Sequence, residues 1–336
     1  MDATDDEPVL EVLAANRPHV RPHENAVAVC STEHELLIAV ASSRQLLISS
    51  LERSSVVQLL TPSRVDEIRC VAFCRATCLL AAGAGEAVSI YSPADRTTDG
   101  STEARQWQCH SELSHGEAIT CIAWPAPQPG QPPALWVAGC TIALWRFSTA
   151  SGWQRAWSRL QAAPVRHMAA SVHGTLLATA GSHDRLVKVW HRAPRAYRGG
   201  AVASVAQPAL YDFCYLRHPT EVTSLDWRPA ERGAPHGLEG DASADAAILL
   251  TASTDGMPRL WRMARPPEPE PLRMFLCATL TADSSGAQAE RSASTESSAQ
   301  HVQLVQWLEP TSRPSFSVLT AMCDLMNLMD SFMARR

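Results

Sequence analysis

Lysine is almost absent from this chain of 336 residues, and what else the sequence lacks excludes several functions. Of its 29 basic residues only Lys188 is a lysine, and the arginines are scattered singly, without the basic block or aromatic-interleaved groove that phosphate binding needs. With a formal net charge of −5, this pattern argues against nucleic acid as a partner. No run of about eighteen apolar residues exists, so we expect no membrane-spanning helix. The acidic segment Met1–Pro8 lacks the apolar core of a secretory signal or transit peptide.

The ten cysteines include no C-x-x-C pair and no Cys/His cluster at zinc spacing. Most lie in strand-like runs, which favours reduced thiols in a cytosolic setting. Cys70, Cys74 and Cys78 recur at four-residue intervals, but this helical period falls in a segment that reads as strand, turn, strand. We therefore interpret them as small buried hydrophobic residues, and we predict neither a metal site nor a cofactor.

The most informative stretch runs from Gly174 to Trp190. It holds two short β-type runs joined by a Gly-Ser-His-Asp turn, and the second run alternates apolar and polar residues, which predicts a hairpin. In that turn the carboxylate of Asp184 can accept backbone N–H groups, and Trp190 at the strand end can fill the gap against a neighbouring sheet. The same pattern recurs at Asp255 and Trp261.

This hairpin belongs to a repeat. Strand-like runs that end at Phe73, Trp124, Ala170 and Trp227 are followed, after 18, 21, 20 and 34 residues, by the apolar-aromatic strand endings Ile90-Tyr91, Leu144-Trp145, Val189-Trp190 and Leu260-Trp261. Repeats of about 40–45 residues with a Trp near the third strand are typical of a WD-type propeller blade of four strands. The sequence predicts an all-β fold, a WD40-type β-propeller of about five to six recognisable blades, and leaves open whether the ring is complete.

We expect the propeller to span residues 24–310, after a polar tail or closing strand at 1–23. Inserts at 193–207, 231–246 and 282–300 are predicted to be flexible, and the last is Ser-, Ala- and Glu-rich. Residues 315–336 place Met and Leu at three- and four-residue steps, which predicts a C-terminal amphipathic helix. That helix would pack on the last blade, or bind a partner or a membrane surface, although its polar face is poor in Lys and Arg.

No catalytic motif stands in the right context. Gly83-Ala-Gly85 follows a strand, but no helix opens after it and the third glycine of a dinucleotide fingerprint is missing. His218, Thr251 or Ser253, Asp255 and Trp261 are placed to form a buried polar chain within one blade, which we interpret as structural and not as a Ser-His-Asp triad. We predict no catalytic, cofactor-binding or metal-binding residues and no enzymatic activity.

Other His and Trp residues fit the same repeat. His115 and His173, like His218, each lie near the start of a repeat. Four tryptophans lie outside the repeat positions, in segments that we assign to outer strands, and we expect them to pack between blades: Trp107, Trp136, Trp153 and Trp157. Any that are exposed would mark an interaction surface.

Several segments also resemble a known family, in the same order along the chain. They are Ser114–Trp124, Leu144-Trp145, Gly174–Trp190, Tyr211-Asp-Phe-Cys-Tyr-Leu-Arg-His-Pro219 with the downstream Trp227-Arg228, and His301–Leu308. Together they resemble the N-terminal propeller region of the rabconnectin/DmX-like proteins, the large subunits of the RAVE complex. The resemblance is strongest over residues 114–263 and extends over 20–310. The Phe-Cys-Tyr-Leu-Arg-His-Pro element and the order of the segments are its specific part.

The resemblance implies a non-enzymatic scaffold that promotes assembly of the vacuolar proton-transporting ATPase and so supports organelle acidification. It implies protein partners, namely peripheral-sector subunits of that pump and other RAVE-type subunits, with no small-molecule substrate. The implied location is cytoplasmic and peripheral to vacuole, endosome or Golgi membranes, reached only indirectly through partners. Family members are far longer and carry a second propeller and a helical region. The Met-rich tail has no counterpart that we can identify in them, and a truncated product is one interpretation.

The alternative is a generic WD40 adaptor, for example a substrate receptor of a ubiquitin ligase. Such propellers often carry Trp-Asp-x-Arg after the third strand of a blade. The corresponding residues are Trp190-His191 and Trp261-Arg262, which weakens that interpretation.

Overall fold

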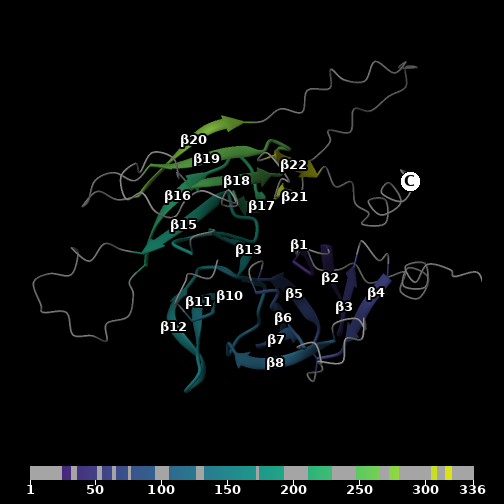
Figure 1. Ribbon diagram of the computed structural model, residues 1–336. Helices are drawn as coiled ribbons and strands as arrows, with labels where there is room; N and C mark the ends of the chain where they lie inside the picture. Colours follow the sequence, from purple (N-terminus) through teal and green to yellow (C-terminus); the bar gives the residue numbers. More distant parts are fainter. Residues whose placement is uncertain are drawn as a thin grey trace, which may run out of the picture. The chain divides into compact units, whose positions relative to one another are not determined.

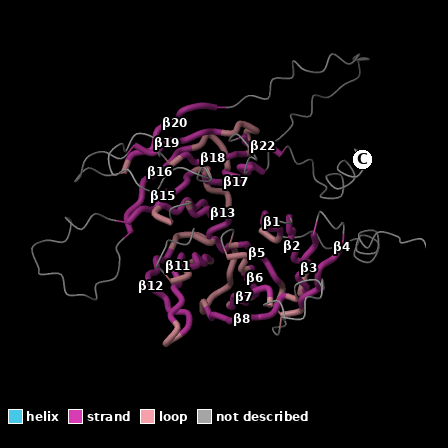
Figure 2. The backbone as a smooth tube through the Cα atoms, in the orientation of Figure 1, coloured by secondary structure: helices cyan, strands magenta, loops and turns pink. Residues whose placement is uncertain are grey.

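Five four-stranded antiparallel sheets dominate the computed structural model (Figure 1). It describes residues 25–31, 36–50, 55–62, 66–74, 77–94, 106–125, 132–171, 174–192, 211–228, 247–264, 272–279, 304–308 and 315–319. Within these ranges the chain forms strands, turns and loops, with no helix (Figure 2). In particular, no described helix has the length and hydrophobicity to cross a bilayer.

The chain divides into two compact units, residues 1–166 and 167–336. The first unit holds three of the sheets, each built from four consecutive strands. The first sheet contains β1 (Val27–Ser31), β2 (Leu36–Ser42), β3 (Gln45–Ser50) and β4 (Ser55–Leu60). The second contains β5 (Ile68–Phe73), β6 (Leu80–Ala84), β7 (Ala87–Pro93) and β8 (Trp107–Ser114). The third contains β9 (Cys121–Ala123), β10 (Ala134–Ala138), β11 (Thr141–Ser148) and β12 (Gly152–Leu160).

The second unit holds two further four-stranded sheets and a two-stranded ribbon, and the unit boundary falls inside β13. The fourth sheet contains β13 (Val165–Ala170), β14 (Leu176–Gly181), β15 (Leu186–Arg192) and β16 (Tyr211–Arg217). The fifth contains β17 (Val222–Trp227), β18 (Ile248–Ser253), β19 (Arg259–Ala264) and β20 (Arg273–Thr279). The ribbon pairs β21 (Leu304–Leu308) with β22 (Ser315–Leu319).

Burial falls from the middle of each sheet toward its last strand. All five residues of β6 are buried, because both faces of that strand are covered by neighbouring sheets, and its sequence is accordingly apolar and small. The last strand of the third sheet, β12, has no buried residue along its nine positions. This gradient explains why the second and third strands of each repeat carry the clearest hydrophobic signal.

A backbone hydrogen bond recurs between successive sheets. The N–H of a residue at or near the start of one sheet donates to the turn that joins the second and third strands of the preceding sheet. The N···O distances run from 2.7 to 3.0 Å, for Ile68 to Ser43 and Ile119 to Gly85 in the first unit and for Val222 to Asp184 in the second. Because each bond is made by backbone groups, it fixes the offset between sheets for many different side chains.

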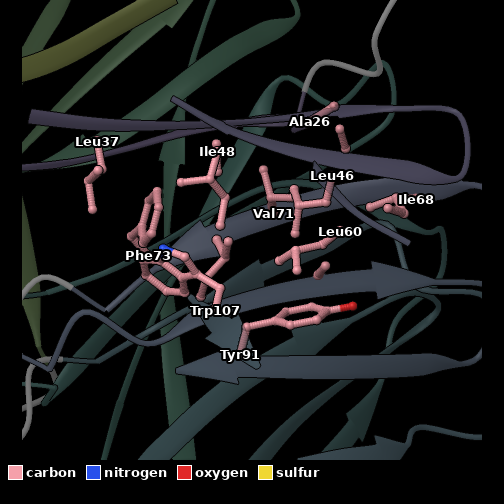
Figure 3. Packing of buried hydrophobic residues seen from close by; sticks show 14 of the residues in the cluster. Ala26, Leu37, Leu46, Ile48, Leu60, Ile68, Val71, Phe73, Tyr91 and Trp107 are labelled. Atoms are coloured by element: carbon pink, nitrogen blue, oxygen red, sulfur yellow. The ribbon is translucent and has the colours of Figure 1, made fainter. Parts of the chain in front are cut away.

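The hydrophobic core lies between neighbouring sheets. Figure 3 shows the cluster between the first two sheets, in which Ile48 of β3, Phe73 of β5 and Trp107 of β8 lie close together. The rings of Phe73 and Trp107 meet edge-on with centroids 5.8 Å apart. A second cluster in the same unit joins the sheets of β5–β8 and β9–β12, and a third joins β13–β16 and β17–β20. Each sheet therefore depends on its neighbours for most of its burial.

The predicted all-β, WD40-type propeller fold is confirmed. The prediction of a helix over residues 315–336 was wrong at its start, because Ser315–Leu319 forms strand β22. Pairing with β21 outweighs the helical spacing of the apolar residues there. Residues 320–336 lie outside the described part of the chain, as do 1–23 and the predicted inserts 193–207, 231–246 and 282–300. The assignment of Trp136 to an outer strand was also wrong, because it lies in β10, inside its sheet.

Candidate functional site

The fifth sheet contains the buried polar chain that the sequence predicts. The indole N–H of Trp261 donates to the Thr251 hydroxyl at 2.9 Å, and that hydroxyl lies 2.8 Å from Nε2 of His218. Thr251 is fully buried and His218 nearly so. Burial, with a smaller contribution from the nearby Arg259 charge, lowers the pKa of His218 to about 4, so its imidazole is neutral at physiological pH.

A second polar cluster lies beside this chain, around Asp255 in the turn between β18 and β19. The Ser253 hydroxyl donates to Asp255 at 2.7 Å, and the two terminal nitrogens of the Arg259 guanidinium donate to the same carboxylate. Burial alone would raise the pKa of Asp255, but the hydrogen bonds from Arg259, Ser253 and the Met257 N–H outweigh it and lower that pKa to about 2. Arg259 was not predicted from the sequence as part of this cluster. The spacing in the sequence could have indicated this contact, because an arginine four residues after an aspartate in a turn can reach the carboxylate of that aspartate.

The geometry separates the residues that look like a catalytic triad. His218 bonds Thr251, whereas Ser253 bonds Asp255 and Arg259, so the serine and the histidine belong to different clusters. Thr251 and Ser253 are both fully buried. This arrangement suits a set of hydrogen bonds that fixes the packing of one sheet, because Thr251, Ser253 and His218 are buried and Asp255 is held in the adjoining turn.

The fourth sheet repeats part of the pattern. Trp190 Nε1 donates to the buried Thr179 hydroxyl at 2.9 Å, as Trp261 does to Thr251. The carboxylate of Asp184 accepts the Leu186 N–H at 3.2 Å, which is the turn role that the sequence predicts for it. His173 lies outside the described residues.

The third sheet has the histidine and the tryptophan but not the hydroxyl between them. Trp145 pairs with Leu135, just as Trp261 pairs with Leu249, so Val137 stands where Thr251 stands in the fifth sheet. The buried Nε1 of Trp145 accordingly has no hydrogen-bond partner. His115 turns to the Thr141 carbonyl at 3.2 Å, and burial lowers its pKa.

The cysteines and the glycine pair have packing roles. Cys70 lies in β5, with Cys74 and Cys78 after it and before β6, as expected for strand, turn, strand. Burial raises the pKa of the Cys70 thiol, and a Cβ added to Gly83 would lie 2.6 Å from its sulfur. Gly83 is therefore required by close packing and not by a phosphate. Among the described residues no group of three or more His, Cys, Asp or Glu side chains is placed to hold a metal ion.

Of the four tryptophans outside the repeat positions, Trp107 and Trp153 pack between sheets, as expected. Trp153 of β12 donates its indole N–H to the Ser111 hydroxyl of β8 at 3.0 Å, and Trp107 joins the core between the first and second sheets. Trp157 instead meets Trp136 of its own sheet edge-on, with ring centroids 5.8 Å apart.

Outer strands carry the exposed apolar side chains that an interaction surface needs. Tyr215 of β16 is 51% exposed, and Phe275 and Leu276 of β20 are 52% and 49% exposed. On β16 the rings of Phe213 and Tyr215 meet edge-on, and the Lys188 ammonium lies 5.6 Å from the Phe213 ring centroid. Exposed aromatic residues of this kind often carry the binding energy of protein interfaces.

The β11–β12 hairpin is a second exposed surface, which was not predicted from the sequence. Arg146, Arg155 and Arg159 are exposed on it, and Leu160 at its end is 72% exposed. The signal that could have revealed it is the absence of any Asp or Glu from Ala118 to His183. The arginines of this surface are scattered singly and form no basic block, so its positive charge is visible in the sequence only as a long stretch without Asp or Glu.

Comparison with known proteins supports the same fold and resemblance. The family described as "WD domain, G-beta repeat" matches residues 158–191. DmX-like protein 1 of Mus musculus is 24% identical over 267 residues, which cover 72% of this chain and 8% of that protein, and the human protein matches equally well. The Saccharomyces cerevisiae protein "Regulator of V-ATPase in vacuolar membrane protein 1" is 22% identical over 160 residues, 46% of this chain and 10% of that protein.

Among solved structures, Chaetomium thermophilum Sqt1 bound to the N-terminus of ribosomal protein L10 is 16% identical, with a TM-score of 0.47, over 71% of this chain and 72% of that one.

The part of the DmX-like proteins that this chain matches is less than a tenth of their length. The sheets, the repeat, the matching WD-repeat family model and the DmX-like relatives together lead to one conclusion: the chain has a WD40-type propeller fold and resembles the rabconnectin/DmX-like proteins.

Proposed function

We propose that this chain is a non-enzymatic WD40 scaffold that promotes assembly of the vacuolar proton-transporting ATPase and so supports organelle acidification. The observation that carries the proposal is the similarity to DmX-like protein 1 across 72% of the chain. The yeast relative points the same way, since its name describes a regulator of V-ATPase in the vacuolar membrane. The partners would be peripheral-sector subunits of the pump and other RAVE-type subunits. The chain would be cytoplasmic and would reach endomembranes only by binding these partners.

The structural features that support a scaffold are rigidity and exposed recognition residues. The polar groups around Thr251 are buried and bonded to one another, which suits a packing role and leaves no exposed nucleophile among them. The half-exposed Tyr215 and Phe275 lie on outer strands, where a partner can reach them. Loops and rims on a rigid β framework are the usual binding surfaces of such folds.

The experiment is affinity purification of the tagged chain from cells, followed by quantitative mass spectrometry. Enrichment of peripheral-sector pump subunits supports the proposal, and enrichment of cullin adaptors instead would favour the ubiquitin-ligase receptor. A Tyr215→Ser/Phe275→Ser double variant tests whether the exposed aromatics contribute, with Ser43→Ala in an inter-strand turn as control. In parallel, ratiometric measurement of lumenal pH after depletion should show raised pH; an unchanged pH together with no pump subunit in the purification would refute the proposal.

A further inference from the structure

The third sheet segregates positive charge in a chain that is acidic overall. Its strands β9–β12 lie within the 66 residues from Ala118 to His183, which contain no Asp or Glu. Three exposed arginines, Arg146, Arg155 and Arg159, lie on the β11–β12 hairpin. No acidic residue lies within this hairpin, so its charge is positive even when Glu117, whose carboxylate accepts the Thr141 N–H at the start of β11, is counted with it.

The last strand of this sheet offers an open edge. β12 is the longest strand that the structure describes, with nine residues, and it pairs with β11 on one side and with no described strand on the other (Figure 1). None of its side chains is buried, and Leu160 at its end is 72% exposed. A long, exposed edge strand displays a row of backbone N–H and C=O groups that another strand can pair with.

The register places cations on both faces of this edge. Arg155 pairs with Trp145, and its guanidinium carbon lies 6.0 Å from the centroid of that ring. A register shift between Leu144 and Trp145 then puts Arg159, which pairs with Ile142, on the opposite face. A strand added to β12 would therefore meet an arginine whichever way its side chains alternate.

Charged side chains on an edge strand commonly prevent pairing with other strands. On β12 the positive charges also determine which kind of strand can pair with this edge. A second copy of this chain would bring its own Arg155 and Arg159 to the same edge, where like charges oppose each other. An acidic strand would place carboxylates opposite the guanidiniums, in the planar geometry that Arg recognises well. The charge of the edge thus disfavours pairing with a second copy and favours an acidic occupant.

We propose that the edge of β12 that pairs with no described strand binds an extended, acidic segment of a partner protein by β-strand addition, with Arg155 and Arg159 as the residues that select for acidity. This inference rests on the proposed scaffold function, for which it names one binding surface and the chemistry of its partner. It goes beyond the resemblance, which indicates neither the strand nor the charge of what it binds.

The test measures binding of the full chain to a fluorescein-labelled peptide of about ten residues that alternates Glu and Thr, by fluorescence anisotropy. A Gln/Thr peptide is the matched neutral probe. We expect the acidic peptide to bind at least about ten-fold more tightly than the neutral one, and the Arg155→Glu/Arg159→Glu variant to lose about ten-fold or more of that affinity, since each reversal replaces an attraction by a repulsion. The control Arg44→Glu/Arg217→Glu changes two exposed arginines elsewhere and the net charge equally, and should bind like the unmodified chain.

Backbone pairing is tested with two N-methylated acidic peptides, one methylated at odd and one at even positions. Strand addition uses one edge of the peptide, so only one of the two should lose binding. Equal binding of both, or equal loss in the control variant, would overturn the proposal. So would tighter binding of a single-stranded oligonucleotide or of anionic vesicles, because the hairpin would then be a general polyanion site. Capture of pump subunits that survives the Arg155/Arg159 reversal, with no peptide binding, would refute this inference and leave the scaffold function intact.

Discussion

Replacing Thr251 by Val tests whether the buried polar chain specifies the packing of the fifth sheet. The two side chains have nearly the same shape, so the substitution removes the hydroxyl with little change in volume. It deletes the partner of both Trp261 Nε1, at 2.9 Å, and His218 Nε2, at 2.8 Å. Leaving a buried polar group unpaired costs about 1–3 kcal/mol. With two groups affected, we expect the free energy of unfolding to fall by about 3 kcal/mol.

The matched control is Thr179→Val in the fourth sheet. The Thr179 hydroxyl accepts one hydrogen bond, from Trp190 Nε1, so the same change there should cost about 1–2 kcal/mol, roughly half as much. Both values come from urea unfolding of the purified chain, followed by tryptophan fluorescence and far-UV circular dichroism. Equal losses in the two variants, or a loss below about 1 kcal/mol in Thr251→Val, would show that the chain of hydrogen bonds does not stabilise the sheet as argued.

Three further outcomes are expected from the same unfolding assay. Val137→Thr should stabilise by about 1 kcal/mol because it supplies the partner that Trp145 lacks; destabilisation would contradict the equivalence of the sheets. His218 has a pKa of about 4 in the folded chain and 6.5 in the unfolded chain, so the unfolded chain binds a proton first as the pH falls. The free energy of unfolding should therefore decrease between about pH 6.5 and pH 4, by about 3 kcal/mol at pH 4. His218→Gln should remove this contribution of His218 to the pH dependence. Gly139→Ala should destabilise by about 2 kcal/mol or more because its Cβ would overlap the Ala118 carbonyl oxygen; an unchanged midpoint would refute this.

The inter-sheet hydrogen bonds explain why degenerate repeats still stack. The first sheet has no Trp at its repeat position, yet the Ile68 N–H donates to the Ser43 carbonyl as Val222 does to Asp184. Backbone groups carry this contact, so it survives the loss of the side chains by which repeats are recognised. Sequence similarity between repeats can therefore decay further than their structural equivalence.

The propeller blades were predictable because their signal is local. Alternating apolar residues, a short turn and a Trp at the strand end, as in Leu176–Trp190, lie within one hairpin, where neighbours in sequence are also neighbours in the sheet. By contrast, the helical period of Val318 and Leu319 misled, since pairing with β21 outweighed it. A periodic pattern indicates a preferred secondary structure, but pairing with another strand can override that preference.

The sequence by itself determined the all-β class, the four-strand repeat and the residues Asp184, Trp190, His218 and Trp261 as parts of it. Only the tertiary structure decided that His218 bonds Thr251 while Ser253 bonds Asp255 and Arg259. It alone decided that one edge of β12 pairs with no described strand and that arginines lie on both faces of this strand. The reason is physical: a strand's alternation is set by its own pleat, whereas hydrogen-bond partners and exposure depend on residues brought together from distant parts of the chain.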